Sequence, residues 1–175
     1  MPKSLFGVVR RLWLAGLLLP VGCYSFQGGS LPADLHSVAV PVVADRSGAG
    51  AGWLRPELMR GVLAKIESES GLRIADSMGR ADAVLDMTLV HYSDAPSQLS
   101  AVTGRAGMNR VSVVVEASLL DQVHKRRIFS ERFTGFADYP AGDFGARDVA
   151  AGFALRQIID TIVDEVVSGW HGYKE

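Results

Sequence analysis

The side chains that could do chemistry in this sequence are four histidines, one cysteine and two groups of basic residues. The histidines are His36, His91, His124 and His171, and their wide spacing gives no local pair of the His-x-x-x-His kind that binds a metal ion. The sequence also lacks the Gly-x-x-x-x-Gly-Lys-Ser loop that holds phosphates and the Gly-x-Ser-x-Gly turn that presents a nucleophilic serine. We therefore expect no enzyme activity, no bound metal and no cofactor.

The single cysteine stands at the end of an apolar leader. Residues 1–11 are short and positively charged, and the apolar residues 12–21 are well short of the roughly 20 that a spanning helix needs. The leader ends in Pro20-Val21-Gly22-Cys23, which resembles the lipobox of bacterial lipoproteins, although Pro20 stands where that pattern prefers Leu. The resemblance implies that residues 1–22 are a lipoprotein signal peptide and that Cys23 becomes the lipidated N-terminus, with palmitate among its acyl chains.

Such an anchor would hold the protein to a membrane. Each buried methylene of an acyl chain contributes about 0.8 kcal/mol, so several chains together bind essentially permanently. Tyr24 occupies the position where Asp is the enteric signal for inner-membrane retention, which favours the outer membrane at its periplasmic face. The alternative is an uncleaved N-terminal anchor, because no charged residue occurs between Leu12 and Ala33.

Length and composition predict one globular domain after the leader. The chain has 175 residues, of which 48% are hydrophobic and 21% are charged, with a formal net charge of −1. Removing the three cations of the leader leaves 15 basic against 19 acidic groups, a net charge of −4. This balance argues against nucleic-acid binding, which needs many neutralising cations. We assign residues 23–36 to a lipidated tether and residues 37–175 to the domain.

Hydrophobic periodicity predicts five strands and two helices. Apolar residues alternate at a period of two in the strands and recur at helical spacing in the helices, with Pro56 in a first helical turn and Gly71 just past a helix end. The expected strands are 37–43, with Pro41 at an edge or bulge, then 72–74, 83–93, 109–121 and 126–137; the expected helices are 56–70 and 148–168.

The order β-α-β-β-β-β-α predicts an α+β fold. Four successive strands without an intervening helix favour a mostly antiparallel sheet with both helices on one face, a two-layer α/β sandwich. Residues 122–125 form a tight turn, whereas residues 95–108 are expected to be a long loop. Phe129, Glu131 and Phe133 share one face of their strand, which predicts a bulge or an exposed aromatic residue.

Several short segments together carry a resemblance to a known family. They are Gly22-Cys23-Tyr24-Ser25-Phe26, Gly28-Gly29-Ser30-Leu31-Pro32, Val38-Ala39-Val40-Pro41, Arg46-Ser47-Gly48, Ala81-Asp82-Ala83-Val84-Leu85 and a hairpin that ends at Tyr139. In this order they resemble the lipopolysaccharide (LPS) assembly lipoprotein family, LptE. The resemblance covers nearly all of the mature chain and implies an outer-membrane lipoprotein that sits as a plug inside the LptD β-barrel, helps it assemble and binds LPS.

An LPS binder should present clustered Arg and Lys side chains, because LPS carries phosphates and carboxylates. Two groups qualify: Arg105 with Arg110, and Lys125 with Arg126 and Arg127 at the hairpin turn. Either group could instead be a solubilising surface.

Four further residues have more than one interpretation. Trp53 and Tyr139 could be interface anchors or packing residues. Asp94 and Asp121, at expected strand ends, fit the capping of turns better than the binding of a metal.

Two other function classes stay open. The Val-Ala-Val-Pro strand before a helix, with the Ala-Asp-Ala-Val-Leu strand, is also similar to CsgG-like secretion lipoproteins and to lipoproteins that activate peptidoglycan synthases. A membrane-tethered hydrolase would require polar side chains that converge in a pocket, for example His91 or His124 beside a buried carboxylate in a deep cleft.

Overall fold

The protein is described by a computed structural model that covers residues 35–99 and 106–168. The predicted signal peptide 1–22 and the predicted lipid anchor Cys23 lie outside the described residues. The elements, in chain order, are β1 (Ser37–Ala39), β2 (Ala44–Asp45), α2 (Leu54–Glu69), β3 (Arg73–Ile74), the 3-10 turn η1 (Met78–Arg80), β4 (Ala83–Leu99), β5 (Ala106–Asp121), β6 (Arg126–Pro140) and α3 (Phe144–Ser168).

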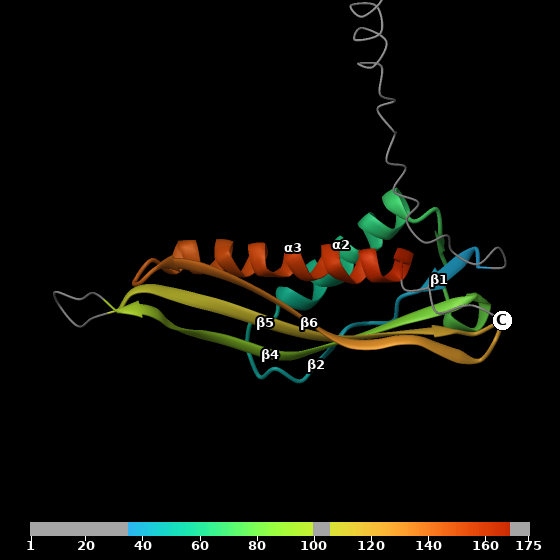
Figure 1. Cartoon of the computed structure of the whole chain (residues 1–175), viewed down its shortest axis with the longest axis horizontal. Coiled ribbons are helices and arrows are strands. Elements are labelled where there is room, and N and C mark those ends of the chain that lie inside the picture. Colours follow the sequence, from blue (N-terminus) through green and yellow to red (C-terminus); the bar gives the residue numbers. More distant parts are fainter. Residues whose placement is uncertain (1–34, 100–105, 169–175) are drawn as a thin grey trace, which may run out of the picture.

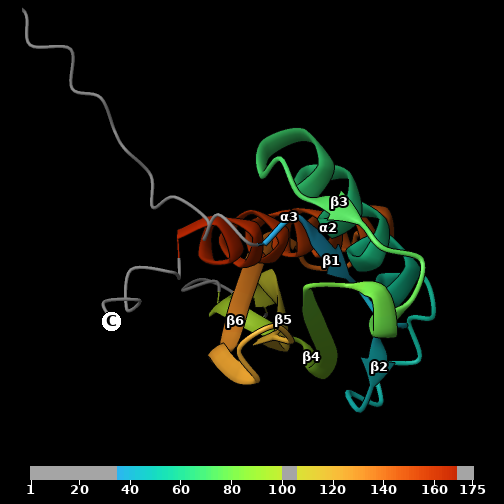
Figure 2. The ribbon, with the colours of Figure 1, turned by 90° about the vertical axis from the view of Figure 1, so that its right-hand side faces the viewer.

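These elements form a two-layer α+β sandwich, which confirms the predicted fold class. The six-stranded sheet has the order β3-β1-β4-β5-β6, with β2 also paired to β4. β4, β5 and β6 form a long antiparallel meander. β1 pairs in parallel with both β3 and β4, and β2 pairs in parallel with β4. Both helices lie on one side of the sheet (Figures 1 and 2).

Alternation along the strands places the core between the sheet and the helices. In β5, every second residue from Val111 to Leu119 is buried, and its neighbours point to the opposite face. The predicted stripe of α3 packs onto this surface, with buried residues Leu155, Ile158, Ile162 and Val166. Burial of apolar side chains on one face of each element therefore fixes the two layers.

A glycine in β6 lets α3 approach the sheet closely. A Cβ atom built on Gly135 would collide with the carbonyl oxygen of Ala154 and would lie 3.1 Å from Ile158 Cγ1. Gly135 pairs with Val113 of β5 on the helix-covered face. A side chain at this position would push α3 off the sheet, so a glycine in mid-strand serves close packing here.

The Ala81–Leu85 motif has a structural role that its aspartate explains. The Asp82 carboxylate accepts hydrogen bonds from the backbone N–H groups of His36 (3.0 Å) and Ser37 (2.9 Å) and from the Ser37 hydroxyl (2.8 Å). The hydrogen bond from the Ser37 hydroxyl, followed by that from the His36 N–H, holds the pKa of Asp82 below its usual value. Asp82 therefore joins the start of β1 to the start of β4.

The helix ends follow capping chemistry. Pro56 lies in the first turn of α2, and Gly71, with φ +71°, follows the last turn in the left-handed conformation, both as predicted. α3 begins four residues before the predicted Asp148. The Asp143 carboxylate accepts the Ala146 N–H at 2.9 Å and so caps an earlier first turn.

The predicted long loop at residues 95–108 is wrong. β4 continues to Leu99 and β5 begins at Ala106, so paired strands replace most of that loop. Pro96 is tolerated because β4 is an edge strand beyond its short pairing with β2, and a missing N–H costs little at an edge. The expected strand 37–43 is interrupted instead: β1 ends at Ala39 and pairing resumes as β2.

A bulge in the β5–β6 pairing sets the register, as predicted from the crowded face of β6. Leu120 pairs with Arg127 but Leu119 pairs with Phe129, which leaves Ile128 as the extra residue. Phe129 and Phe133 both become buried, with their ring centroids 6.1 Å apart in an edge-on contact.

Candidate functional site: the open face of the sheet

The face of the sheet opposite the helices is polar. Along β4, β5 and β6 it carries hydroxyl side chains at alternate positions: Ser93, Ser112, Ser118, Ser130 and Thr134. In Figure 2 neither helix lies on this side of the three strands. We call this surface, formed by the outward residues of β4, β5 and β6, the open face.

Two adjacent rows of the open face bring an arginine, an aspartate and a phenylalanine together. Ala95, Arg110 and Asp138 pair across β4, β5 and β6 in one row, and Ser93, Ser112 and Phe136 pair in the next. The Arg110 Nε and Nη2 atoms each donate a 2.8 Å hydrogen bond to the Asp138 carboxylate, and the guanidinium lies 4.5 Å from the centre of the Phe136 ring. This forked pair is the geometry in which arginine binds carboxylates most specifically.

The pair carries little net charge. The hydrogen bonds from Arg110, and to a smaller extent one from Ser97, hold the pKa of Asp138 below its usual value, so the carboxylate is ionised at neutral pH. The hydrogen bond to Asp138 likewise raises the pKa of Arg110. Arg110 is therefore already engaged by an anion of the protein itself.

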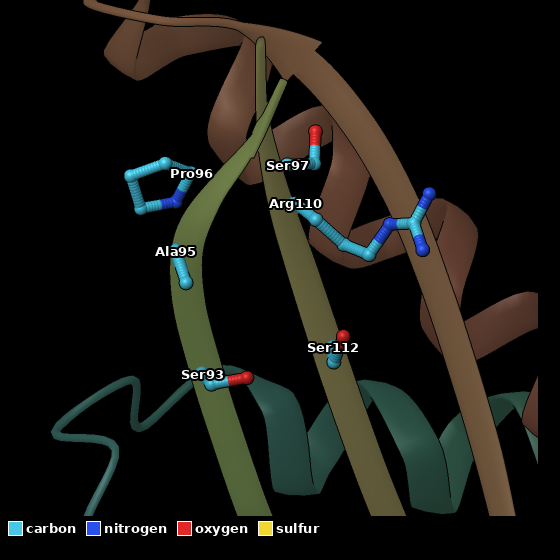
Figure 3. Close-up of a pocket in the computed structure, with 6 residues that line it drawn as sticks. All are labelled: Ser93, Ala95, Pro96, Ser97, Arg110 and Ser112. Carbon is cyan, nitrogen blue, oxygen red and sulfur yellow. The ribbon is translucent and has the colours of Figure 1, made fainter. Parts of the chain in front are cut away.

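A cavity opens beside this pair. Its volume is about 250 Å³, and it is lined by Ser93, Ala95, Pro96, Ser97, Arg110 and Ser112. Figure 3 shows these residues on neighbouring strands, with the Arg110 side chain crossing toward the third. Hydroxyl groups and a guanidinium thus border a space of small-molecule size.

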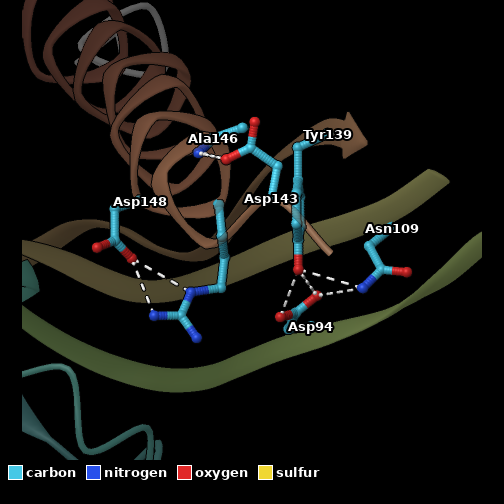
Figure 4. A network of polar contacts seen from close by, with 7 residues as sticks. Asp94, Asn109, Tyr139, Asp143, Ala146 and Asp148 are labelled. Atoms are coloured by element: carbon cyan, nitrogen blue, oxygen red, sulfur yellow. Dashed lines mark hydrogen bonds and ion pairs between the residues drawn. The ribbon is translucent and has the colours of Figure 1, made fainter. Parts of the chain in front are cut away.

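On the helix-covered face, a buried tyrosine connects the same ends of β4, β5 and β6. The Tyr139 hydroxyl lies 2.7 Å from both carboxylate oxygens of Asp94, and the Asn109 side-chain amide donates to it at 3.2 Å (Figure 4). Burial, followed by the hydrogen bond to Asp94, raises the pKa of Tyr139, so it remains a hydrogen-bond donor. Tyr139 is 4% exposed and is a packing residue. The expectation that Asp94 caps a turn is wrong, because Asp94 lies within β4.

The second basic group lies far from this cavity. Lys125, Arg126 and Arg127 are exposed at the turn between β5 and β6, and Lys125 has a left-handed backbone with φ 55°. This turn and Arg110 are at opposite ends of β5, roughly 35 Å apart at the usual strand rise of about 3.3 Å per residue. Arg105 lies outside the described residues. The structure therefore places Arg110 far from the three basic residues of the hairpin turn.

The hairpin turn contains a buried carboxylate beside a histidine. Asp121 is fully buried and accepts the backbone N–H groups of Val123 (2.8 Å) and His124 (3.0 Å), which confirms that it caps the turn. His124 Nδ1 lies 2.7 Å from the same carboxylate, but the His124 side chain is 44% exposed. The pair lies at the surface of a turn and not in a deep cleft, so the condition set for a hydrolase is met only in part.

Neither a metal-binding cluster nor a membrane-spanning helix occurs in the described part of the chain. Within residues 35–99 and 106–168, no group of three or more His, Cys, Asp or Glu side chains is placed to hold a metal ion. No helix in these same ranges is long and apolar enough to cross a bilayer.

Exposed phenylalanines on α3 form a second surface feature. Phe144 and Phe153 are 70% and 52% exposed, and Val149 between them is 57% exposed. An arginine lies over each ring, Arg147 at 5.7 Å from Phe144 and Arg156 at 4.3 Å from Phe153. Trp53, at the start of α2, is 39% exposed and stays a candidate anchor.

Known structures with this fold include bacterial lipoproteins. Rare lipoprotein B from Shewanella oneidensis superimposes with a TM-score of 0.55 at 14% identity, covering 76% of this chain and 95% of that one. An uncharacterized lipoprotein B from Nitrosomonas europaea gives a TM-score of 0.53 at 16% identity, covering 86% of this chain and 95% of that one. The chain therefore has the fold of these lipoproteins, which is consistent with the fold implied by the LptE resemblance.

The same fold also occurs in a protein that forms dodecamers. The PelC dodecamer from Paraburkholderia phytofirmans gives a TM-score of 0.52 at 16% identity, covering 80% of this chain and 94% of that one. No protein-family model and no curated protein matches the sequence. At these identities the likeness concerns the fold alone.

The Arg110–Asp138 pair and the cavity were not predicted from the sequence. The turn at 122–125, continued without a bulge, would place Arg110 opposite Ala137. The bulge at Ile128 shifts the pairing by one residue and brings Asp138 to Arg110. The signal that could have found the pair is the placement of Phe129, Glu131 and Phe133 on one face, which predicted either a bulge or an exposed aromatic residue.

Proposed function

We propose that the protein is an outer-membrane lipoprotein of the LPS transport and assembly machinery. It would be anchored through Cys23 at the periplasmic face, would bind LPS, and would act as plug and assembly partner of an LptD-type β-barrel, without catalysis. The observation that carries this proposal is a lipobox-like leader in front of a domain with the fold of rare lipoprotein B.

The surface of the domain supports binding more than chemistry. Val149 and Phe153 are exposed and lie four residues apart on one face of α3, which gives an apolar patch that a protein partner could cover. Lys125, Arg126 and Arg127 present three cations on one turn, the chemistry that phosphates require. Arg110 is less suited to binding a free phosphate, because its guanidinium already donates two hydrogen bonds to the Asp138 carboxylate.

Replacing Cys23 with Ser tests the anchor. The variant should fold normally but move from the membrane fraction to the soluble periplasmic fraction, because the acyl chains supply the membrane affinity. Fractionation after a carbonate wash, together with mass spectrometry of the N-terminus, measures both effects. A variant that stays in washed membranes would contradict anchoring through this residue.

Reversing Lys125, Arg126 and Arg127 to Glu tests the LPS contact. LPS affinity should fall about tenfold or more, since each lost charge-assisted hydrogen bond is worth about 1.5–3 kcal/mol, while the melting temperature changes little. The same reversal at the exposed residues Arg60, Arg73 and Arg80 is the control for net charge. Equal loss in the two variants would remove the hairpin turn from the LPS contact.

A secretion or synthase-activating scaffold is the second candidate. The dodecameric state of PelC, which shares the fold, favours it. Light scattering of the detergent-purified protein separates the two proposals: a ring of many copies supports the scaffold, whereas a stable one-to-one complex with a large barrel supports the assembly role.

A further inference from the structure

The cavity on the open face has a mixture of donors and acceptors that the proposed assembly role does not explain. Its lining brings together the hydroxyls of Ser93, Ser97 and Ser112 with the guanidinium of Arg110, and the Asp138 carboxylate accepts from that guanidinium (Figure 3). Each serine hydroxyl can both donate and accept a hydrogen bond. A ligand with several hydroxyl groups of its own would match this arrangement.

Charge argues for a neutral ligand here. The Asp138 pair uses two of the five N–H groups of Arg110, which leaves three for a ligand, but a phosphate would meet the Asp138 carboxylate beside them. A ligand hydroxyl avoids this repulsion, because it can accept from Arg110 and donate to Asp138. Adjacent hydroxyl groups, as on a sugar ring, could satisfy both residues at once.

An apolar surface lies next to the polar groups. Phe136 lies beside the cavity lining, pairs with Ser112 across the strands and is 48% exposed. The Arg110 guanidinium lies 4.5 Å from the centre of its ring, so the part of the ring that Arg110 leaves uncovered is the apolar surface. Sugar rings combine hydroxyl edges with apolar C–H faces, and such faces pack on aromatic rings. The volume of about 250 Å³ is large enough for a single sugar ring.

We propose that this cavity binds a saccharide through adjacent hydroxyl groups, with Ser93, Ser112 and Arg110 as its main contacts. The inference rests on the proposed function only for the source of the sugar, which would be the core oligosaccharide of LPS. Under this assignment LPS meets the protein at two places, its phosphates at the hairpin turn and its sugars at the cavity.

Calorimetric titration of the full chain in detergent with deacylated, dephosphorylated LPS core oligosaccharide tests the proposal. Wild type should bind saturably, and Ser112→Val should weaken binding about tenfold, the effect of losing one hydrogen bond of about 1.4 kcal/mol. Ser118→Val is the matched control, because Ser118 lies on the same face of β5, opposite Asp86 and Ser130 and outside the cavity. Its affinity should stay within twofold, and both variants should keep the wild-type melting temperature.

Three results would overturn the saccharide site: no saturable binding to wild type, equal weakening in both variants, or displacement of the oligosaccharide by inorganic phosphate. A peptidoglycan disaccharide serves as a second probe, and preference for it would support the site while changing the source of the sugar. Intact LPS separates this inference from the proposed function. If LPS binds and the oligosaccharide does not, the cavity assignment fails alone; if the oligosaccharide binds and LPS does not, the proposed function fails alone.

Discussion

The two faces of β5 consist of alternate residues of one strand, yet they serve different purposes. Val111, Val113 and Val115 on one face are completely buried under α3, whereas the alternating residues Ser112, Val114 and Glu116 are partly exposed on the open face. Packing restricts the first set to apolar residues of the right size. The second set is free to vary, and the proposed saccharide contacts lie there.

The largest loss of stability is expected at Gly135, where α3 packs most closely against the helix-covered face of the sheet. Gly135→Ala should reduce the free energy of unfolding by about 3 kcal/mol, because the added methyl group collides with the Ala154 carbonyl of α3. Thr134→Ala, one residue away on the open face, should change it by less than about 0.5 kcal/mol. Urea denaturation measures both, and similar effects would mean that α3 does not rest on this strand.

A polar residue should matter for stability where it joins strands. Asp82→Ala should cost about 2 kcal/mol at pH 7, since it leaves the Ser37 hydroxyl and two backbone N–H groups without their acceptor. Asp86→Ala, exposed on the open face of β4, is the control and should cost little.

The cost of losing Asp82 should also depend on pH. Because the pKa of Asp82 is lowered in the folded state, its contribution is present above the unfolded value of about 3.9 and is lost as the pH falls through the lower folded value. The stability difference between wild type and Asp82→Ala should therefore be constant from pH 7 to 5 and shrink below about pH 4. A difference that does not shrink at all as the pH falls below 4 would contradict the charged clamp.

The smallest change in stability is expected from replacing either of two adjacent valines in β5 with threonine. Val113→Thr should destabilise by about 1–2 kcal/mol, because it buries a hydroxyl in an apolar core, whereas Val114→Thr on the open face should be nearly neutral. Thermal unfolding of the two variants compares the faces with the same chemical change. Equal melting temperatures would show that the faces are not distinguished as described.

Sequence periodicity predicted the layers, because burial on one face leaves a period of two in β5 and a helical stripe in α3. The extent of the hairpin was not predictable in the same way. Pro96 and the glycines near 104–107 favour turns locally, but pairing of β4 with β5 continues past Pro96 because β4 is an edge strand there. The Arg110–Asp138 pair depends on a single bulge, and a shift of one residue would move every contact of the strand to the other face.

The proposed function requires that this protein binds a β-barrel and LPS. Affinity purification of the tagged full chain from detergent-solubilised outer membranes, with mass spectrometry of the eluate, tests it most directly. We predict a large β-barrel of the LptD type in one-to-one ratio, with LPS in the same fraction. Recovery of the protein as a ring of its own copies, or with a peptidoglycan synthase and no barrel, would contradict the account.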